Sequence, residues 1–327
     1  MRKILFITAA FTLLAGGAAH AAVDAATELD TTCLNCHGDN RDKVSLSNNQ
    51  WTKHNGGRVT ADVYAAVNLF LLAPPPPPPP PPPTSEILWR NQVTGANMIW
   101  HMEGENYVSS SPIDSVSDLN WKIVGRADFN GDGHSDILWR NTATGVNRVW
   151  YMNLNTKLGF EVIGGATDPA WTVVGTGDFN DDGEPDILWR NTSTGTNIVW
   201  YMSYVAGLTK IGHATIGGVA DQNWTIVGTG DFNNDGKLDI LWRNTANGMI
   251  VTWYMNGVTY LGSGRVGVVA DQDWKIAGVR DVDGDASPDI LWRNRVTGAN
   301  LVWRMSGVTR SGNAALRSAP PQWTIGN

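Results

Sequence analysis

Cysteine is almost absent from this sequence of 327 residues. The only two cysteines, Cys33 and Cys36, are separated by two residues. Such a pair cannot provide the set of disulfides that stabilises many small secreted proteins. A disulfide-rich fold is therefore excluded.

Charged residues and long apolar runs are also few. Lys, Arg, Asp and Glu make up 17% of the residues and the formal net charge is −7, without a basic cluster that would favour nucleic acid. The apolar run from Ile4 to Leu14 is too short to favour a membrane-spanning helix. Because Arg2 and Lys3 precede it and Ala19-His20-Ala21 follows, it is typical of a secretory signal peptide over residues 1–21. We expect an exported protein without a membrane span, located in the periplasm, at the cell surface or outside the cell.

Tryptophan, by contrast, is abundant, and 15 of its 16 residues follow a repeat. The sequence I-L-W-R-N starts at intervals of 50, 50, 53 and 50 residues, at Ile87, Ile137, Ile187, Ile240 and Ile290. The sequence W-x-I, with Val in place of Ile in the copy at Trp171, starts at Trp121, Trp171, Trp224, Trp274 and Trp323. Self-similarity at this period indicates a propeller or a solenoid. We expect most of the repeated tryptophans to lie in the core between repeats, a role favoured over sugar binding.

Each repeat reads as four short strands separated by turn residues, which is one propeller blade. The strand alternation within I-L-W-R-N places Ile and Trp on one face and Leu and Arg on the other. The first repeat lacks a W-x-I strand before it, and the last lacks an I-L-W-R-N strand after it. Pairing these two ends would hide both open edges. We therefore predict an all-β, five-bladed propeller over residues 84–327, with an open array of five units as the alternative.

Residues 22–73 lack the repeat and contain Cys33-Leu34-Asn35-Cys36-His37. The pattern C-x-x-C-H attaches c-type haem through two thioether bonds, with the histidine as an axial iron ligand. A zinc site would need further Cys or His residues nearby, and a redox dithiol would need a βαβ surround. The segment resembles a small c-type cytochrome domain, which implies one covalent haem c held by Cys33, Cys36 and His37.

The second axial ligand of this haem is harder to assign. Residues 22–73 contain no methionine, and their only other histidine is His54, which we take as the candidate. The alternative is that His54 is a solvated loop residue and the iron is five-coordinate or ligated by a partner. The apolar spacing predicts a helix from Ala61 to Leu72 in this α-helical segment, and its apolar face around Val67 and Phe70 would cover the haem or, as the alternative, pack only on the first helix. Ten prolines, Pro74 to Pro83, follow as a semi-rigid polyproline II spacer.

A loop rich in Asp, Asn and Gly joins W-x-I to the next I-L-W-R-N four times. Loop positions 1, 3, 5, 7 and 9 carry Asp128, Asn130, Asp132, His134 and Asp136; Asp178, Asn180, Asp182, Glu184 and Asp186; Asp231, Asn233, Asp235, Lys237 and Asp239; and Asp281, Asp283, Asp285, Ser287 and Asp289. Oxygen ligands at these positions surround a hard cation as in the first part of an EF-hand loop. Position 7 would contribute its backbone carbonyl, and glycine at position 6 permits the tight turn.

With their flanking strands, these loops resemble the FG-GAP/VCBS repeat family, whose propeller blades carry D-x-[DN]-x-D-G-x-x-D calcium loops. The resemblance extends from Thr84 to the C-terminus and implies three to four structural Ca²⁺ ions. Two departures stand out: Ala286 replaces the glycine of the fourth loop, and Ser85-Glu86 stands in place of a loop in the first repeat. The alternative is a set of Asx turns without metal, but their carboxylates would then repel one another without compensation.

These features lead to three hypotheses for the function. The first is an exported electron-transfer protein whose propeller is a docking or assembly platform for a redox partner or extracellular acceptor. The second is an adhesin-like or lectin-like binding module, by which the propeller binds protein or glycan or self-assembles. The third, a propeller that oxidises a substrate and reduces its own haem, has no cofactor motif to support it. We expect an electron carrier or binding protein rather than an enzyme.

Overall fold

The computed structural model describes residues 84–326, which form only β-strands and the connections between them. No part of this described range forms a helix of the length and apolarity that a bilayer span requires. The predicted signal peptide, the haem segment with His54 and the Ala61 to Leu72 helix, and the proline spacer lie outside the described residues.

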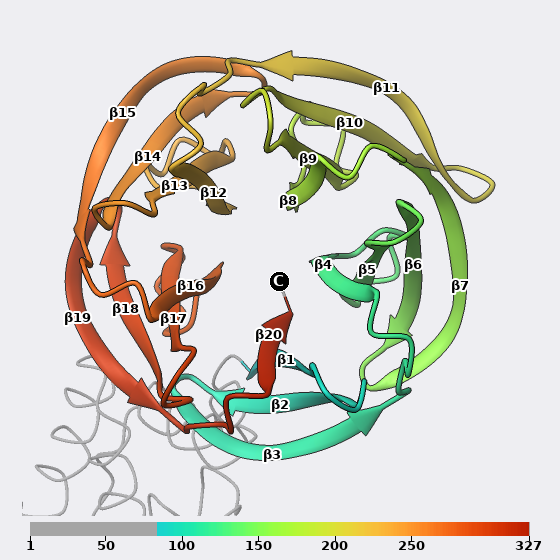
Figure 1. The fold of residues 1–327 in the computed structure, drawn as a ribbon, viewed down its shortest axis with the longest axis horizontal. Helices are drawn as coiled ribbons and strands as arrows, with labels where there is room; N and C mark the ends of the chain where they lie inside the picture. Colours follow the sequence, from blue (N-terminus) through green and yellow to red (C-terminus); the bar gives the residue numbers. More distant parts are fainter. Residues whose placement is uncertain (1–83, 327) are drawn as a thin grey trace, which may run out of the picture. The chain divides into compact units, whose positions relative to one another are not determined.

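Five four-stranded antiparallel sheets are arranged around a ring, as the blades of a propeller (Figure 1). Blade 1 consists of β20 (Trp323–Gly326), β1 (Thr84–Asn91), β2 (Asn97–Glu103) and β3 (Asn106–Ile113). Blade 2 consists of β4 (Trp121–Ala127), β5 (Asp136–Asn141), β6 (Val146–Asn153) and β7 (Thr156–Gly165). Blade 3 consists of β8 (Trp171–Gly177), β9 (Asp186–Asn191), β10 (Asn197–Tyr204) and β11 (Leu208–Ile216). Blade 4 consists of β12 (Trp224–Gly230), β13 (Asp239–Asn244), β14 (Met249–Asn256) and β15 (Thr259–Val268). Blade 5 consists of β16 (Trp274–Arg280), β17 (Asp289–Asn294), β18 (Asn300–Ser306) and β19 (Thr309–Leu316).

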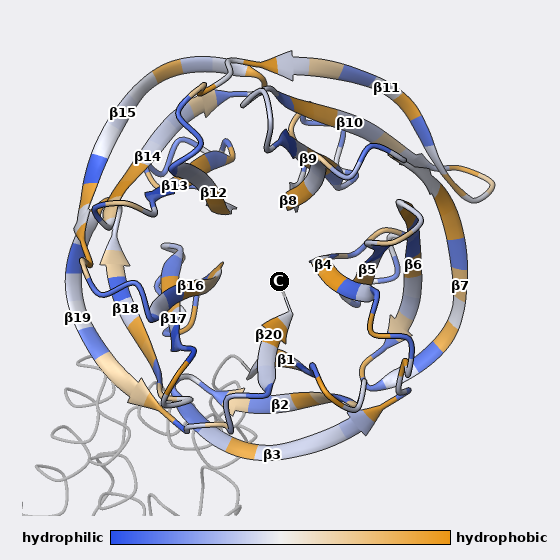
Figure 2. Ribbon diagram, viewed as in Figure 1, coloured by the Kyte–Doolittle hydropathy of each residue, from blue (hydrophilic) through white to orange (hydrophobic). Residues whose placement is uncertain are grey.

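The W-x-I strand is the innermost strand of every blade. In blades 2 to 5 it pairs with the I-L-W-R-N strand that follows it in the chain, as in the register Trp121↔Asn141 of β4 and β5. A strand that completes one repeat in sequence therefore belongs to the next blade in space. The innermost strands β4, β8, β12, β16 and β20 surround a central channel and carry apolar segments (Figure 2).

Blade 1 is assembled from the two ends of the propeller sequence. Strand β20 pairs with β1 in the register Leu88↔Gly326 to Asn91↔Trp323. The predicted closure is therefore confirmed, and the open five-unit array is wrong. Closure removes the two free edges that would otherwise promote edge-to-edge association.

The hydrophobic core is divided into five clusters, each at the contact of two neighbouring blades. At the contact of blades 1 and 2, Ile137 and Trp139 of one blade pack with Leu88 and Ile99 of the other. The second-strand tryptophans are exposed by 1% or less; they are Trp89, Trp139, Trp189, Trp242 and Trp292. This packing confirms the predicted alternation, because Ile and Trp face one neighbouring blade and Leu faces the other. It also confirms that these tryptophans belong to the core.

The arginine of I-L-W-R-N adds a cation–π contact across every blade boundary. The guanidinium carbon lies 4.8–5.1 Å from the ring centroid of the next blade's tryptophan in the pairs Arg90/Trp139, Arg140/Trp189, Arg190/Trp242, Arg243/Trp292 and Arg293/Trp89. The last pair joins blade 5 to blade 1, so the series closes on itself. Such contacts contribute ~0.5–2 kcal/mol each, with the larger values where the pair is desolvated, as it is here.

Candidate functional site

Four loops with one backbone conformation connect the first and second strands of blades 2 to 5. The residue at loop position 4 has a positive φ in every copy: Gly131 (72°), Asp181 (61°), Asn234 (58°) and Gly284 (82°). Position 6 behaves likewise: Gly133 (87°), Gly183 (86°), Gly236 (81°) and Ala286 (68°). The fourth loop therefore makes the same turn as the others although it carries alanine, at a cost of ~1–2 kcal/mol for a left-handed non-glycine residue.

The aspartate at position 1 accepts hydrogen bonds from the backbone of its own loop and so stabilises the turn. In the first loop, Asp128 accepts hydrogen bonds from the backbone N–H groups of Gly131 (2.8 Å), Asp132 (3.1 Å) and Gly133 (2.7 Å). In the fourth loop, Asp281 accepts from Gly284 (2.7 Å) and Ala286 (2.9 Å). These are the Asx-type bonds that the metal-free alternative requires. They do not exclude a cation, because each carboxylate oxygen has two lone pairs.

The aspartate at position 9 connects the loop to the blade. Asp136 is fully buried (0% exposed), and its two oxygens accept the backbone N–H groups of Phe129 (3.0 Å) and of Met152 in β6 (2.8 Å). Asp186, Asp239 and Asp289 make the equivalent bonds in the other three loops. Burial raises the pKa of Asp136 to about 6; the two backbone hydrogen bonds oppose this rise, and the charges of Asp132 and Asp128 add to it. The same causes raise the pKa of Asp186 and Asp239 to about 6, and that of Asp289 in the same direction.

Positions 3 and 5 bring further oxygens to the loop. In the first three loops, the asparagine at position 3 donates its side-chain amide to the aspartate at position 5, as Asn130 does to Asp132 at 3.0 Å. The backbone N–H of His134 donates to Asp132 at 2.9 Å, and this bond is the main cause that lowers the pKa of Asp132. The equivalent N–H groups of Glu184, Lys237 and Ser287 donate at 2.8 Å. The backbone carbonyl role of these position-7 residues stays a prediction.

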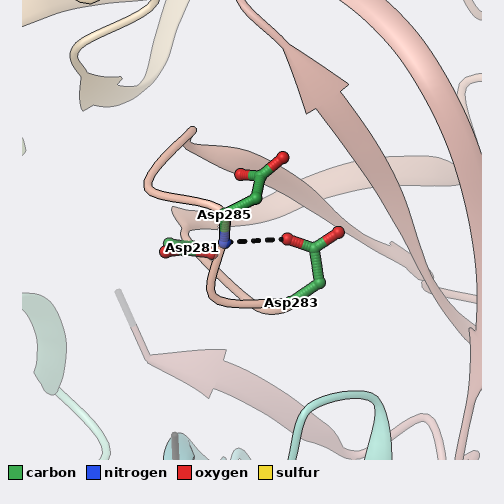
Figure 3. Close-up of side chains that lie close together, drawn as sticks. All are labelled: Asp281, Asp283 and Asp285. Carbon is green, nitrogen blue, oxygen red and sulfur yellow. Dashed lines mark hydrogen bonds between the residues drawn. The ribbon is translucent and has the colours of Figure 1, made fainter. Parts of the chain in front are cut away.

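The fourth loop carries a carboxylate at each of positions 1, 3 and 5, since its position 3 is aspartate. Figure 3 shows Asp281, Asp283 and Asp285 extending from this single loop, with a hydrogen bond from the Asp285 N–H to Asp283 (3.3 Å). Each of the three offers a carboxylate oxygen, and these oxygens lie within 4.8 Å of one another. Oxygen ligands of one Ca²⁺ lie ~2.3–2.6 Å from the ion, so that two of them are at most about 5 Å apart. The spacing and the hard oxygen donors therefore fit calcium.

Blade 1 has no loop, and a cluster of charged side chains takes its place. Glu86 stands where the other blades carry the buried position-9 aspartate. Its carboxylate pairs with Arg126 of β4 (Oε2 to Nη2, 2.9 Å) and lies 3.7 Å from His101 Nδ1. Its backbone carbonyl accepts a hydrogen bond from Arg280 of β16. His101 also contacts the hydroxyl of Ser111 at 2.9 Å.

This cluster lies at the channel, in a cavity of about 830 Å³ lined by Glu86, Arg126, Arg280 and apolar residues of the innermost strands. The sequence analysis does not identify this cluster, because nearly uniform repeats do not show which side chains meet at the channel. The available signal was a departure from the repeat. Arg126 stands where the other blades have Thr176, Thr229 and Val279, and Arg280 where they have Ala127, Gly177 and Gly230.

The family model described as FG-GAP-like repeat matches three overlapping segments, residues 128–189, 178–242 and 231–292. No curated protein matches the sequence.

Among solved structures, a protein of unknown function from Bacteroides caccae is similar at 11% identity and a TM-score of 0.36, over 70% of this chain and 73% of that one. A nidogen/laminin complex is similar at 13% identity and a TM-score of 0.41, over 71% and 78% of the two chains. An auxiliary nutrient binding protein from Bacteroides thetaiotaomicron is similar at 9% identity and a TM-score of 0.33, over 70% and 78%.

Proposed function

The chain belongs to the family of FG-GAP-like repeat proteins, and we propose that it is an exported c-type cytochrome whose calcium-stabilised propeller serves as a platform. The haem segment, residues 22–73, would exchange electrons with a redox partner or an extracellular acceptor. Residues 74–83 would hold it at a distance from the propeller. The single observation that carries the proposal is Cys33-Leu34-Asn35-Cys36-His37 behind an export signal.

The donor set of this segment suits haem c. Two thiols at this spacing can each form a thioether bond, and the adjacent imidazole can bind iron. In the proposal Cys33 and Cys36 tether the haem, His37 is the first axial ligand and His54 the second. The bound haem would supply a one-electron redox centre, and two histidine ligands would set its potential below that of a His/Met pair.

Calcium binding by the four loops would make the propeller rigid. Each loop combines a position-1 aspartate that orders the turn with a buried position-9 aspartate that is bonded to the blade. Four such loops place many carboxylates at one end of the ring, where divalent cations would relieve their mutual repulsion. The ligands would be the residues at positions 1, 3, 5, 7 and 9, and the role of the ion would be structural.

A pyridine haemochrome spectrum tests the redox proposal. The full chain is produced in a host that exports it and attaches haem c, with Cys33→Ser as the matched control. We expect one thioether-bound haem per chain, and less than one for the control. A spectrum without covalent haem would refute the cytochrome assignment.

The same result would favour the second candidate, an exported binding module. That function has its own supporting observation in the charged cluster at the channel, and it does not depend on haem.

A further inference from the structure

The charged cluster of Glu86, Arg126 and Arg280 stands out from the rest of the channel lining. The cavity of about 830 Å³ is lined by aliphatic side chains of the innermost strands, among them Ile123, Val173, Ile226 and Ile276, and by polar side chains that include Thr176 and Thr229. This volume is within the ~300–1,000 Å³ of typical small-molecule sites, which combine an apolar lining with a few fixed polar groups. Arg126, Arg280 and Glu86 would be those polar groups.

The two positive charges of Arg126 and Arg280 are not fully balanced by negative charges in the cluster. Glu86 contributes one carboxylate, and Arg126 occupies one of its oxygens. Within residues 84–326, no ion pair joins Arg280 to a carboxylate, and its one hydrogen-bond acceptor is the backbone carbonyl of Glu86. One positive charge therefore remains in a chain whose formal charge is −7. An arginine side chain stays protonated at neutral pH in a protein, so this charge is present.

Hydrogen-bond donors also remain in this cluster. A guanidinium has five N–H donors, and within the described part of the chain Arg126 and Arg280 each make one side-chain hydrogen bond, to the carboxylate and to the backbone carbonyl of Glu86 respectively. A buried donor left without an acceptor costs ~1–3 kcal/mol, and more when it is charged. An oxyanion could accept from guanidinium groups of this kind with charge-assisted hydrogen bonds.

A nearby carboxylate of the chain does not fill this role. Asp281 also lines the cavity. Its Oδ1 and Oδ2 accept the N–H groups of Gly284 and Ala286, so this carboxylate is directed into its own loop. Neither oxygen pairs with Arg280 in the described structure.

We propose that the channel cavity binds an organic carboxylate, with its anionic head between Arg126 and Arg280 and its apolar body along the aliphatic side chains of the lining. Both arginines are departures from the repeat, and they lie on β4 of blade 2 and β16 of blade 5, the two neighbours of the blade that has no loop. The equivalent positions of other blades carry Thr, Val, Ala or Gly, so the fold does not require arginine there. Binding of this carboxylate would not depend on the haem.

The repeat itself supplies substitutions that the fold accepts. Arg126→Thr copies Thr176 and Thr229, and Arg280→Ala copies Ala127. Lys275→Thr copies Thr172 and Thr225 and removes one positive charge from β16 at a position outside the cavity lining, so it is the matched control. Thermal unfolding of each variant checks that the blades remain intact.

Isothermal titration calorimetry at low ionic strength, with calcium present, tests the proposal on the full chain. The probes are phenylacetate, its neutral analogue phenylacetamide, and inorganic phosphate. We expect saturable binding of phenylacetate, at least tenfold weaker binding of phenylacetamide, and at least tenfold weaker phenylacetate binding by Arg126→Thr and Arg280→Ala. Lys275→Thr should bind like the wild type.

Three outcomes would overturn the proposal. The first is that the wild type binds neither phenylacetate nor phosphate. The second is that the arginine variants bind phenylacetate as well as Lys275→Thr does. The third is that phosphate binds more tightly than phenylacetate, which would assign the site to a small inorganic oxyanion and not to an organic acid.

Discussion

Tryptophan and arginine occupy consecutive positions of each I-L-W-R-N strand and therefore face opposite neighbouring blades. Arg293 of blade 5 lies over the ring of Trp89, whereas Arg90 lies over the ring of Trp139 of blade 2. Arg90 also donates to the carbonyl of Gly95 (3.1 Å) and to Asn97 Oδ1 (3.1 Å). A single residue thus fixes both the turn of its own blade and the contact with the next.

We expect Arg190→Met to lower the free energy of unfolding by ~2–4 kcal/mol. The substitution removes the stacking on Trp242 (5.0 Å) and leaves the acceptors Gly195 O and Val219 O without their donor. Urea unfolding measures the change. The control is Arg310→Met, an exposed arginine over Trp303, for which a loss below ~1 kcal/mol is expected. Equal losses in the two variants would contradict a special role for the blade boundary.

The strain at Ala286 gives a second prediction at this scale. We expect Ala286→Gly to stabilise the propeller by ~1 kcal/mol, because glycine adopts a positive φ without a steric penalty. Gly236→Ala is the reverse change at the same loop position (φ 81°), and no atom lies within 4 Å of the added Cβ. It should destabilise by a similar amount. Unfolding in excess chelator measures both changes without a contribution from calcium; two changes of the same sign would refute the explanation.

At the scale of elements, the loop and the hairpin that carries it act as one unit. Asp186 joins the Phe179 and Met202 N–H groups and is fully buried, so the loop is bonded to the third strand of its blade. A cation that stabilises the loop would therefore also stabilise the three strands to which the loop is connected. This explains how a structural ion could matter to a blade that already has a complete sheet.

We expect the propeller to bind four calcium ions and Asp283→Ala to bind three with high affinity. The substitution removes one of three converging carboxylates but not the Asp281 hydrogen bonds that hold the turn. Equilibrium dialysis counts the ions. The control, Asp181→Asn, changes a carboxylate at loop position 4 to the residue that the third loop carries there, Asn234, and should leave the count at four. An unchanged count for Asp283→Ala would contradict the ligand assignment.

The elements were largely predictable from the sequence, and the charged cluster was not. Repetition of I-L-W-R-N revealed the blades, and the unpaired half-hairpins at Ile87 and Trp323 revealed the closure. The turn at Ala286 could not be predicted from the sequence, because the surrounding hairpin decides whether a local penalty of about 1–2 kcal/mol is outweighed. The approach of Arg126 and Arg280 depends on how β4 and β16 converge on Glu86 across the channel, and no local pattern encodes that distance.

At the scale of the whole molecule, the four-residue strand β20 completes the ring. Its residues Trp323 and Ile325 pack against the core cluster between blades 5 and 1. Without β20, the innermost edge of β1 would be free to pair with another chain.

We therefore expect a chain that ends before Trp323 to lose its single cooperative unfolding transition and to associate in solution. Calorimetry and light scattering measure these two properties. Thr324→Ala, which removes only the hydroxyl bonded to Gln92 (2.7 Å), should behave like the wild type. A truncated chain that remains monomeric and equally stable would contradict the role assigned to closure.

The most direct test of the central claim is the intact mass of the exported protein, recorded first under denaturing and then under native conditions. We expect a chain without residues 1–21 that retains one haem after denaturation, and four additional calcium ions in the native state that a chelator removes. A denatured mass equal to that of the polypeptide alone would contradict the cytochrome, and a native mass without calcium would contradict the loops.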